Sequence, residues 1–137
     1  MDFRYGPVEL YLVELKGDSP EPRVVEALRR QVAGGAVRLL DLVRIHRGAD
    51  GSTAIEEVDA EALGLELAEL GVTGEEDVTD LAELVAPGAS AIVVALELRF
   101  LRELAGSLAA SGASILSTER IPAPVINALV DAVHEED

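Results

Sequence analysis

The stretch from Ser90 to Leu98 constrains the fold of this chain more than any other. It reads SAIVVALEL, and apolar residues occupy both alternating faces of the extended chain. A strand that is apolar on both faces lies in the centre of a sheet or is covered on both sides. Residues 100–108 then carry apolar side chains at helical spacing, and an extended run follows at residues 113–121. The order of elements is therefore strand, helix, strand.

The same order is predicted near the N-terminus, with a strand at residues 8–15, a helix at 23–33 and a strand at 37–46. A shift of 76 positions aligns the two regions and places Leu40 on Leu116. Two strand–helix–strand units related in this way are typical of a ferredoxin-like α/β sandwich, an α+β fold. A single domain is the natural expectation for a chain of 137 residues.

Further elements are predicted around this framework. Gly48 to Gly51 indicate a hairpin turn, and the acidic residues 52–58 suit an edge strand. Two short helices are expected as an insertion at about residues 59–86, the first with Leu63, Leu67 and Leu70 facing inward. A C-terminal helix is expected to begin after Pro122.

The predicted sheet has apolar residues on both faces, which favours self-association. In strand 37–46, strict alternation places Asp41 on the core face and Leu40 and Leu42 on the other. Exposing a whole aliphatic face to water is costly, at roughly 25 cal/mol per Å². The inserted helices or a second copy of the chain must cover it. We expect a homo-oligomer, a dimer or larger, with Leu40, Leu42, Val94 and Leu96 at the interface.

Composition excludes several classes of function. A net charge of −15 disfavours binding to nucleic acid or to an anionic membrane surface, and only four aromatic residues are present. The absence of cysteine excludes disulfides and thiolate chemistry. The sequence has neither an 18-residue apolar run nor a secretory signal. We therefore expect a soluble, cytoplasmic protein.

No catalytic, cofactor or metal site is predicted from motifs. The two histidines, His46 and His134, are far apart and have no metal-ligand spacing. The serines lack a nucleophile-elbow context, and the glycines lack a phosphate-loop pattern.

Charged residues on the strands form the one constellation of interest. The hypothesis is a buried polar site in which Glu14, Asp41, Glu97 and Glu119 converge near Arg44 and Arg120. Carboxylates that meet raise one another's pKa and can act as an acid and base pair, whereas pairing with arginine would make them structural. Asp41 is the most informative, because a carboxylate in mid-strand needs an arginine or several backbone donors.

Three functions remain open. The first is a non-enzymatic, self-associating protein. The second is a regulatory or sensor domain that holds a small ligand near Arg38, Arg44 or Arg120. If the chain is monomeric, the pocket is instead expected between the inserted helices and the sheet. The third is a hydrolase or isomerase that uses the carboxylates.

Several segments together resemble a known family. They are GPVEL at residues 6–10, GAVRLLDL at 35–42, Asp50-Gly51 before an acidic strand, and RIPAPV at 120–125. The arrangement is similar to a family of small acidic bacterial proteins with no assigned function, and distantly to ferredoxin-like general stress proteins. The resemblance implies a fold and a stress-related setting. It implies no catalytic residue and no ligand.

Overall fold

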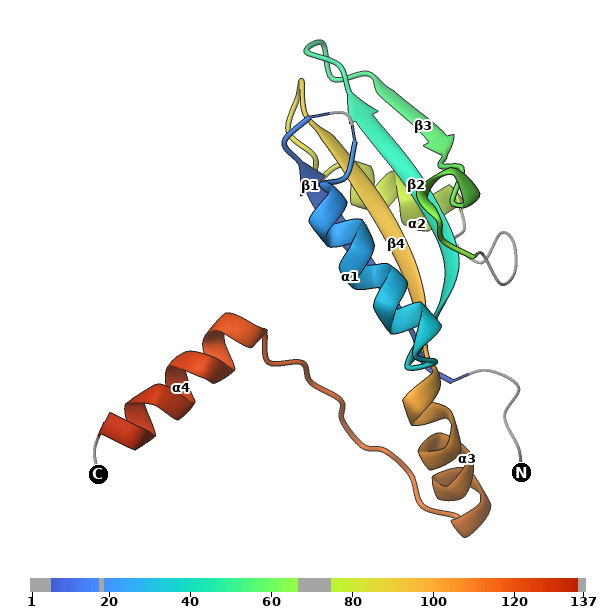
Figure 1. The fold of residues 1–137 in the computed structure, drawn as a ribbon, viewed down its shortest axis with the longest axis vertical. Helices are drawn as coiled ribbons and strands as arrows, with labels where there is room; N and C mark the ends of the chain where they lie inside the picture. Colours follow the sequence, from blue (N-terminus) through green and yellow to red (C-terminus); the bar gives the residue numbers. More distant parts are fainter. Residues whose placement is uncertain (1–5, 18, 67–74, 136–137) are drawn as a thin grey trace.

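The computed structural model describes residues 6–17, 19–66 and 75–135. This part of the chain forms an antiparallel sheet of four strands with helices on both faces and a C-terminal arm (Figure 1). In chain order the elements are β1 (Val8–Leu15), α1 (Pro22–Ala33), β2 (Val37–Arg47), β3 (Thr53–Glu57), η1 (Glu61–Leu63), α2 (Glu75–Ala82), β4 (Ser90–Leu98), η2 (Arg99–Leu101), α3 (Arg102–Ser111) and α4 (Ala123–Glu135).

The strand order is β1-β4-β2-β3, so β4 lies between β1 and β2. It pairs antiparallel with both, and its alternating faces are both largely buried. The central position predicted from SAIVVALEL is therefore confirmed. The short acidic β3 forms one edge through a hairpin with β2, as its sequence predicted.

Helix α1 covers one face of the sheet. Pro22 opens the helix, where its missing N–H costs nothing, and Gly35 adopts a positive φ of 82° just beyond the end. Val25, Leu28 and Val32 lie at helical spacing and pack on the sheet, together with apolar residues around η1. This face thus has its cover within one chain.

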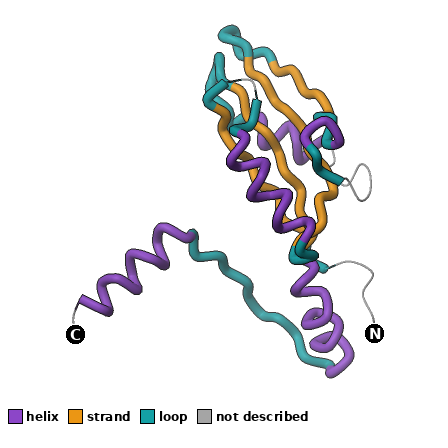
Figure 2. Tube along the Cα trace, in the orientation of Figure 1, coloured by secondary structure: helices purple, strands orange, loops and turns teal. Residues whose placement is uncertain are grey.

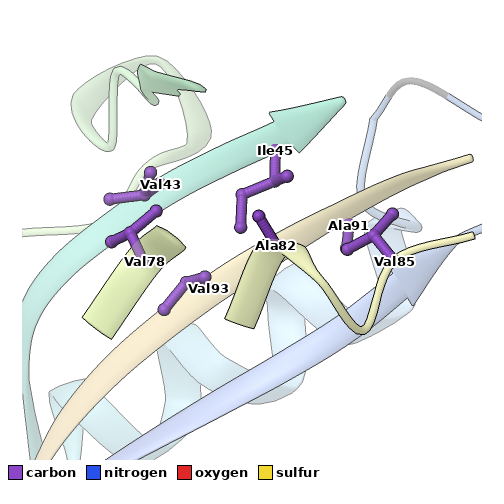
Figure 3. Close-up of a cluster of buried hydrophobic side chains, with 7 residues drawn as sticks. All are labelled: Val43, Ile45, Val78, Ala82, Val85, Ala91 and Val93. Atoms are coloured by element: carbon purple, nitrogen blue, oxygen red, sulfur yellow. The ribbon is translucent and has the colours of Figure 1, made fainter. Parts of the chain in front are cut away.

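Helix α2 covers the opposite face. Val78 and Ala82 of this helix, with Val85 just beyond it, are buried against β2 and β4, and Figure 3 shows these side chains meeting Val43 and Val93. Burying an aliphatic side chain of this kind contributes roughly 1.5–3 kcal/mol. Helices of the same chain therefore cover the apolar sheet on both faces.

Arg47 fixes the end of α2 to the sheet. Its Nη1 lies 3.3–3.5 Å from the carbonyl oxygens of Ala82, Glu83 and Val85. These carbonyls follow the last turn of α2, where the helix dipole favours a cation. The backbone N–H of Arg47 also donates to Ala89 at 3.0 Å. Arg47 therefore fixes both the end of α2 and the segment that leads from α2 into β4.

A β-bulge at Leu40 changes the predicted faces of β2. Leu39 pairs with Leu96 and Asp41 pairs with Ala95, so Leu40 is an extra residue without a partner on β4. Its side chain is nevertheless buried, at 1% exposed.

The bulge shifts the alternation of side chains by one residue. Strict alternation predicted Leu39 on the same face as Val43 and Ile45, which is wrong. Leu39 and Leu42 lie under α1, whereas Val43 and Ile45 lie under α2. Both faces of β2 therefore carry apolar residues, one set packed under α1 and the other under α2.

Two predicted elements differ in the structure. Residues 113–121 are extended but belong to no strand, so the second strand–helix–strand unit is incomplete. The first inserted helix is only the single turn η1, and Leu67 and Leu70 lie outside the described residues. Figures 1 and 2 show α3, the extended segment and α4 standing away from the sheet.

Candidate functional site

A cavity of about 490 Å³ lies between α1 and the sheet. One wall is the inner side of α1, and the floor is formed by β1, β4 and β2. The turn between β1 and α1 closes one end, and the region around η1 closes another. The lining residues are Val13, Glu14, Leu15, Lys16, Ser19, Pro20, Glu21, Val24, Val25, Leu28, Leu42, Leu63, Leu65, Ile92 and Val94.

The wall of the cavity is aliphatic and its polar groups are few. Glu14, Lys16, Ser19 and Glu21 all belong to the end of β1 and the turn that leads into α1. Ligand sites commonly have volumes of 300–1,000 Å³, apolar walls and a small number of polar groups that orient the ligand. The size and the composition of this cavity both fit that description.

The short side chains of this chain explain why the space is open. Only 3% of its residues are aromatic, and none of the lining residues is. Val13, Val24 and Val94 line the cavity with short β-branched side chains. Val24 remains 52% exposed at the cavity, although it lies on α1 next to the buried Val25.

The three arginines predicted to hold a ligand lie elsewhere. Arg38 pairs with Glu97, with 3.1 Å between Nε and Oε1. Arg44 forms an ion pair with Glu56 across the β2–β3 hairpin. None of the residues that line the cavity is an arginine.

Arg120 reaches β1 from the C-terminal arm. It forms an ion pair with Glu9, and its Nη2 donates to the Tyr11 hydroxyl at 3.0 Å. Its guanidinium lies 4.8 Å from the centroid of the Tyr11 ring, within the range of a cation–π interaction.

The four carboxylates predicted to converge are separated. Glu119 is exposed on the extended segment at residues 113–121, outside the sheet. Glu14 pairs with Ala91 and Glu97 pairs with Val8, so the two acids lie at opposite ends of β1, about 20 Å apart at the usual strand rise. Asp41 is 3% exposed and lies on the α2 face. Only Glu14 lines the cavity.

Glu97 is the most deeply buried charged group in the described part of the chain, at 0% exposed. Besides Arg38, its Oε2 accepts a hydrogen bond from the backbone N–H of Gly6 at 2.6 Å. A Cβ at Gly6 would lie 2.7 Å from the carbonyl oxygen of Leu98, so glycine permits this approach. The arrangement is structural, because it ties the N-terminal segment to the central strand.

Asp41 has a partner that the sequence did not reveal. Burial raises the pKa of Glu57 to about 7, and a hydrogen bond to Asp41 and the negative charge of Asp41 act in the same direction. Glu57 pairs with Val43, which places it on the same face as Asp41. The backbone N–H of Leu42 also donates to Asp41 Oδ1 at 2.9 Å. Glu57 can therefore carry a proton close to neutral pH and donate a hydrogen bond to Asp41.

This carboxyl pair predicts that stability falls as pH rises. Between pH 4.5 and about 7 the folded state binds more protons at Glu57 than the unfolded state does, so the free energy of unfolding decreases across this window and is level above it. Glu57 is exposed as a residue, so we discount the effect to roughly 1 kcal/mol. We expect Glu57→Gln to remove the dependence and to stabilise the protein at pH 8 in urea unfolding.

Glu56→Gln is the matched control for this prediction. Glu56 is the neighbouring residue on the opposite face and pairs with Arg44. This variant should keep the decrease between pH 4.5 and 7. An unchanged pH profile in Glu57→Gln would contradict the assignment.

The four residues predicted for an interface lie inside the single chain. Leu40 and Leu42 are 1% and 2% exposed, and Val94 and Leu96 are half-buried against the cluster under α1. The reason is that α1 and α2 occupy the faces that the prediction left open. An interface between copies therefore needs a different surface.

His46 and Ser90 are paired across β2 and β4, with 2.8 Å between Nδ1 and Oγ. No carboxylate among the described residues is hydrogen-bonded to this histidine, so a catalytic triad does not form in the part that the structure describes. The described residues also contain no group of three metal-ligating side chains. Within the same residues, no helix has the length and apolar character to cross a membrane.

Comparison with known proteins places the chain in a family. Residues 4–137 match a family of unknown function, DUF6325. The chain belongs to this family. The matched residues include those that form the sheet, the cavity and the C-terminal arm. No curated protein and no solved structure matches the chain.

Proposed function

We propose that this protein is a binding module that holds a small apolar molecule, uncharged or cationic, in the cavity between α1 and the sheet. The observation that carries the proposal is the aliphatic cavity of about 490 Å³ with its polar groups gathered at one end. This is the ligand-binding hypothesis, with the site moved from the strand-end arginines to the space between helix and sheet. The protein acts by binding, without catalysis.

The charged residues around the cavity and the net charge of the chain indicate which class of ligand it can bind. Glu14 and Glu21 outnumber Lys16 among the charged residues of the lining, and the whole chain carries a net charge of −15. An anionic ligand would meet repulsion at the cavity and from the long-range field of the protein. An uncharged or cationic ligand meets none. The stress-related setting implied by the resemblance adds no further constraint on the ligand.

Leu63→Trp tests the site. Leu63 lines the cavity from the η1 side, and an indole there would occupy space that a ligand needs. The probe is N-phenyl-1-naphthylamine, an uncharged aromatic molecule whose fluorescence rises in apolar surroundings. We expect saturable binding by the wild type and at least tenfold weaker binding by the variant, measured by fluorescence titration.

Ala62→Trp is the matched control, because Ala62 is the adjacent, exposed residue and does not line the cavity. It should bind the probe like the wild type. The wild-type chain contains no tryptophan, so each variant also reports its own indole environment. Equal loss of binding in both variants, or no saturable binding by the wild type, would refute the proposal.

A further inference from the structure

The outer edge of β1 is open. No described strand pairs with this side of its eight residues, because β1 is the terminal strand of the order β1-β4-β2-β3. Val8, Leu10 and Val13 are 41%, 39% and 39% exposed. The opposite edge, β3, is short and acidic, which is a usual protection against pairing with another strand. The edge of β1 has aliphatic side chains instead.

The C-terminal arm, residues 99–135, is the apolar counterpart of this edge. Most of the exposed large apolar side chains of the described residues belong to it. They are Phe100, Leu104, Ile115, Leu116, Ile121, Val125, Ile126, Leu129, Val130 and Val133. Figure 1 shows the arm extending from the end of β4 away from the sheet. An arm of this composition is expected to be covered.

The total accessible surface area of the chain can be compared with that of a compact protein of the same mass. A compact protein of 14.4 kDa exposes about 6,800 Å², whereas this chain exposes 9552 Å². The excess of roughly 2,700 Å² per chain exceeds the ~800 Å² that each partner buries in a standard protein interface. Docking of the arm therefore provides enough area for a stable dimer.

The start of the arm is anchored so that it leads away from its own sheet. The backbone N–H of Phe100 donates to the carbonyl of Ala36 at 3.3 Å, and that of Leu98 donates to Pro7 at 2.7 Å. Gly6 lies against the first residue of α3, Arg102. At the far end of the extended segment, Arg120 returns to Glu9 and Tyr11 of its own β1 while these junction contacts are kept. Exchange with a second copy also keeps the junction, and it replaces the contact of Arg120 with its own β1 by the same contact with the β1 of the other copy.

We propose that two copies of the chain exchange their C-terminal arms, and that residues 114–121 of each copy add as an antiparallel strand to the open edge of β1 in the other. Each sheet gains a fifth strand, and α3 and α4 of the partner cover the side of the sheet beside α1. The strand lies next to Val13, which lines the cavity, so the partner borders the proposed ligand site.

Charge and apolar complementarity set the register. Glu9 and Tyr11 already bind Arg120 of the same chain, which shows that this part of β1 accepts the arginine. With Arg120 of one copy opposite Glu9 of the other, the eight residues 114–121 match all eight of β1. Leu116 then faces Val13.

Single cysteines test the exchange, since the wild-type chain has none. Val13→Cys and Leu116→Cys are prepared as separate variants, mixed, partly unfolded and refolded together, and oxidised. Residues opposite one another on antiparallel strands bring their Cβ atoms close enough for a disulfide. We expect a disulfide-linked dimer of about twice 14.4 kDa on a non-reducing denaturing gel, formed in the mixture far more than in either variant alone.

Leu10→Cys replaces Val13→Cys in the control, because Leu10 is equally exposed but lies on the other face of β1. Its mixture with Leu116→Cys should form little cross-linked product. The double variant Val13→Cys/Leu116→Cys in one chain distinguishes the two occupants of the edge. Cross-linked oligomers support exchange. A cross-linked monomer, or no cross-link in any sample, would overturn it.

The solution mass gives a second readout that does not depend on cysteine. Light scattering of the wild-type protein should give about twice 14.4 kDa at micromolar concentration. Removal of residues 113–137 should yield a monomer. A wild-type monomer would overturn the exchange and would leave the cavity proposal intact, because that cavity has no lining residue from the arm.

Discussion

Arg38→Met is expected to cost about 3–5 kcal/mol of stability, the usual loss when one partner of a buried ion pair is removed. Glu97 is 0% exposed and its charge is balanced by Arg38 from the neighbouring strand. Without the arginine, the carboxylate keeps the Gly6 N–H but has no compensating positive charge. Urea unfolding followed by circular dichroism measures the loss.

Arg44→Met makes the same chemical change on the same strand. Arg44 and Glu56 are both partly solvated, with side chains 36% and 58% exposed, so removing this pair should cost no more than about 1 kcal/mol. The double variant Arg38→Met/Glu97→Leu should recover most of the stability, because an apolar pair no longer buries a charge. Equal losses in the two single variants would show that the burial of Glu97 is not what matters.

Deletion of Leu40 is expected to leave the protein folded but less stable by about 2–5 kcal/mol, the usual cost of losing a buried leucine side chain. Asp41 stays opposite Ala95 and Leu39 stays opposite Leu96, so removal of the extra residue restores a regular ladder and keeps the other side chains of β2 on their faces. The variant should still unfold cooperatively, with its urea midpoint moved to a lower concentration.

Leu40→Ala separates the bulge from the side chain. This substitution keeps the register and removes a side chain that is 1% exposed, at a typical cost of 2–5 kcal/mol. The variant should still unfold cooperatively. The two variants should lose similar stability, and a deletion variant that fails to fold would show that the bulge itself is required.

The sequence predicted the sheet well because its signals are local. The apolar run at residues 90–98 marks a central strand whatever the rest of the chain does, and the glycines between β2 and β3 mark a hairpin. The end of helix α1 is marked by two glycines, Gly34 and Gly35. These features can be recognised without knowing which strands pair with one another.

The bulge was not predictable by the same reasoning. Leu40 lies between Leu39 and Asp41, and the sequence is compatible with alternation that either shifts or does not shift at this point. The error affected the predicted faces of the residues before Asp41. The meeting of Asp41 with Glu57 depends on the register of the β2–β3 hairpin, which the sequence also did not reveal.

The cavity and the position of the arm also could not be read from the sequence. The cavity is a property of how far α1 stands from the sheet, and its residues come from five separate segments. Residues 113–121 have the composition of a strand, but whether they pair depends on the direction in which α3 leaves β4. The sequence also did not show that each of the arginines predicted to hold a ligand pairs with a nearby carboxylate.

The central place of β4 has a consequence for how the chain folds during synthesis. β4 is the last of the four strands to leave the ribosome, yet both β1 and β2 need it as a partner. Before β4 is synthesised, only the local β2–β3 hairpin can form. β1 then has no partner strand, and α1 has no complete sheet to pack against. Pairings between residues as distant as Val8 and Glu97 close long loops and slow folding. The nascent chain must therefore keep an aliphatic strand unpaired for most of its translation, and it is during this interval that its large negative charge would best limit aggregation.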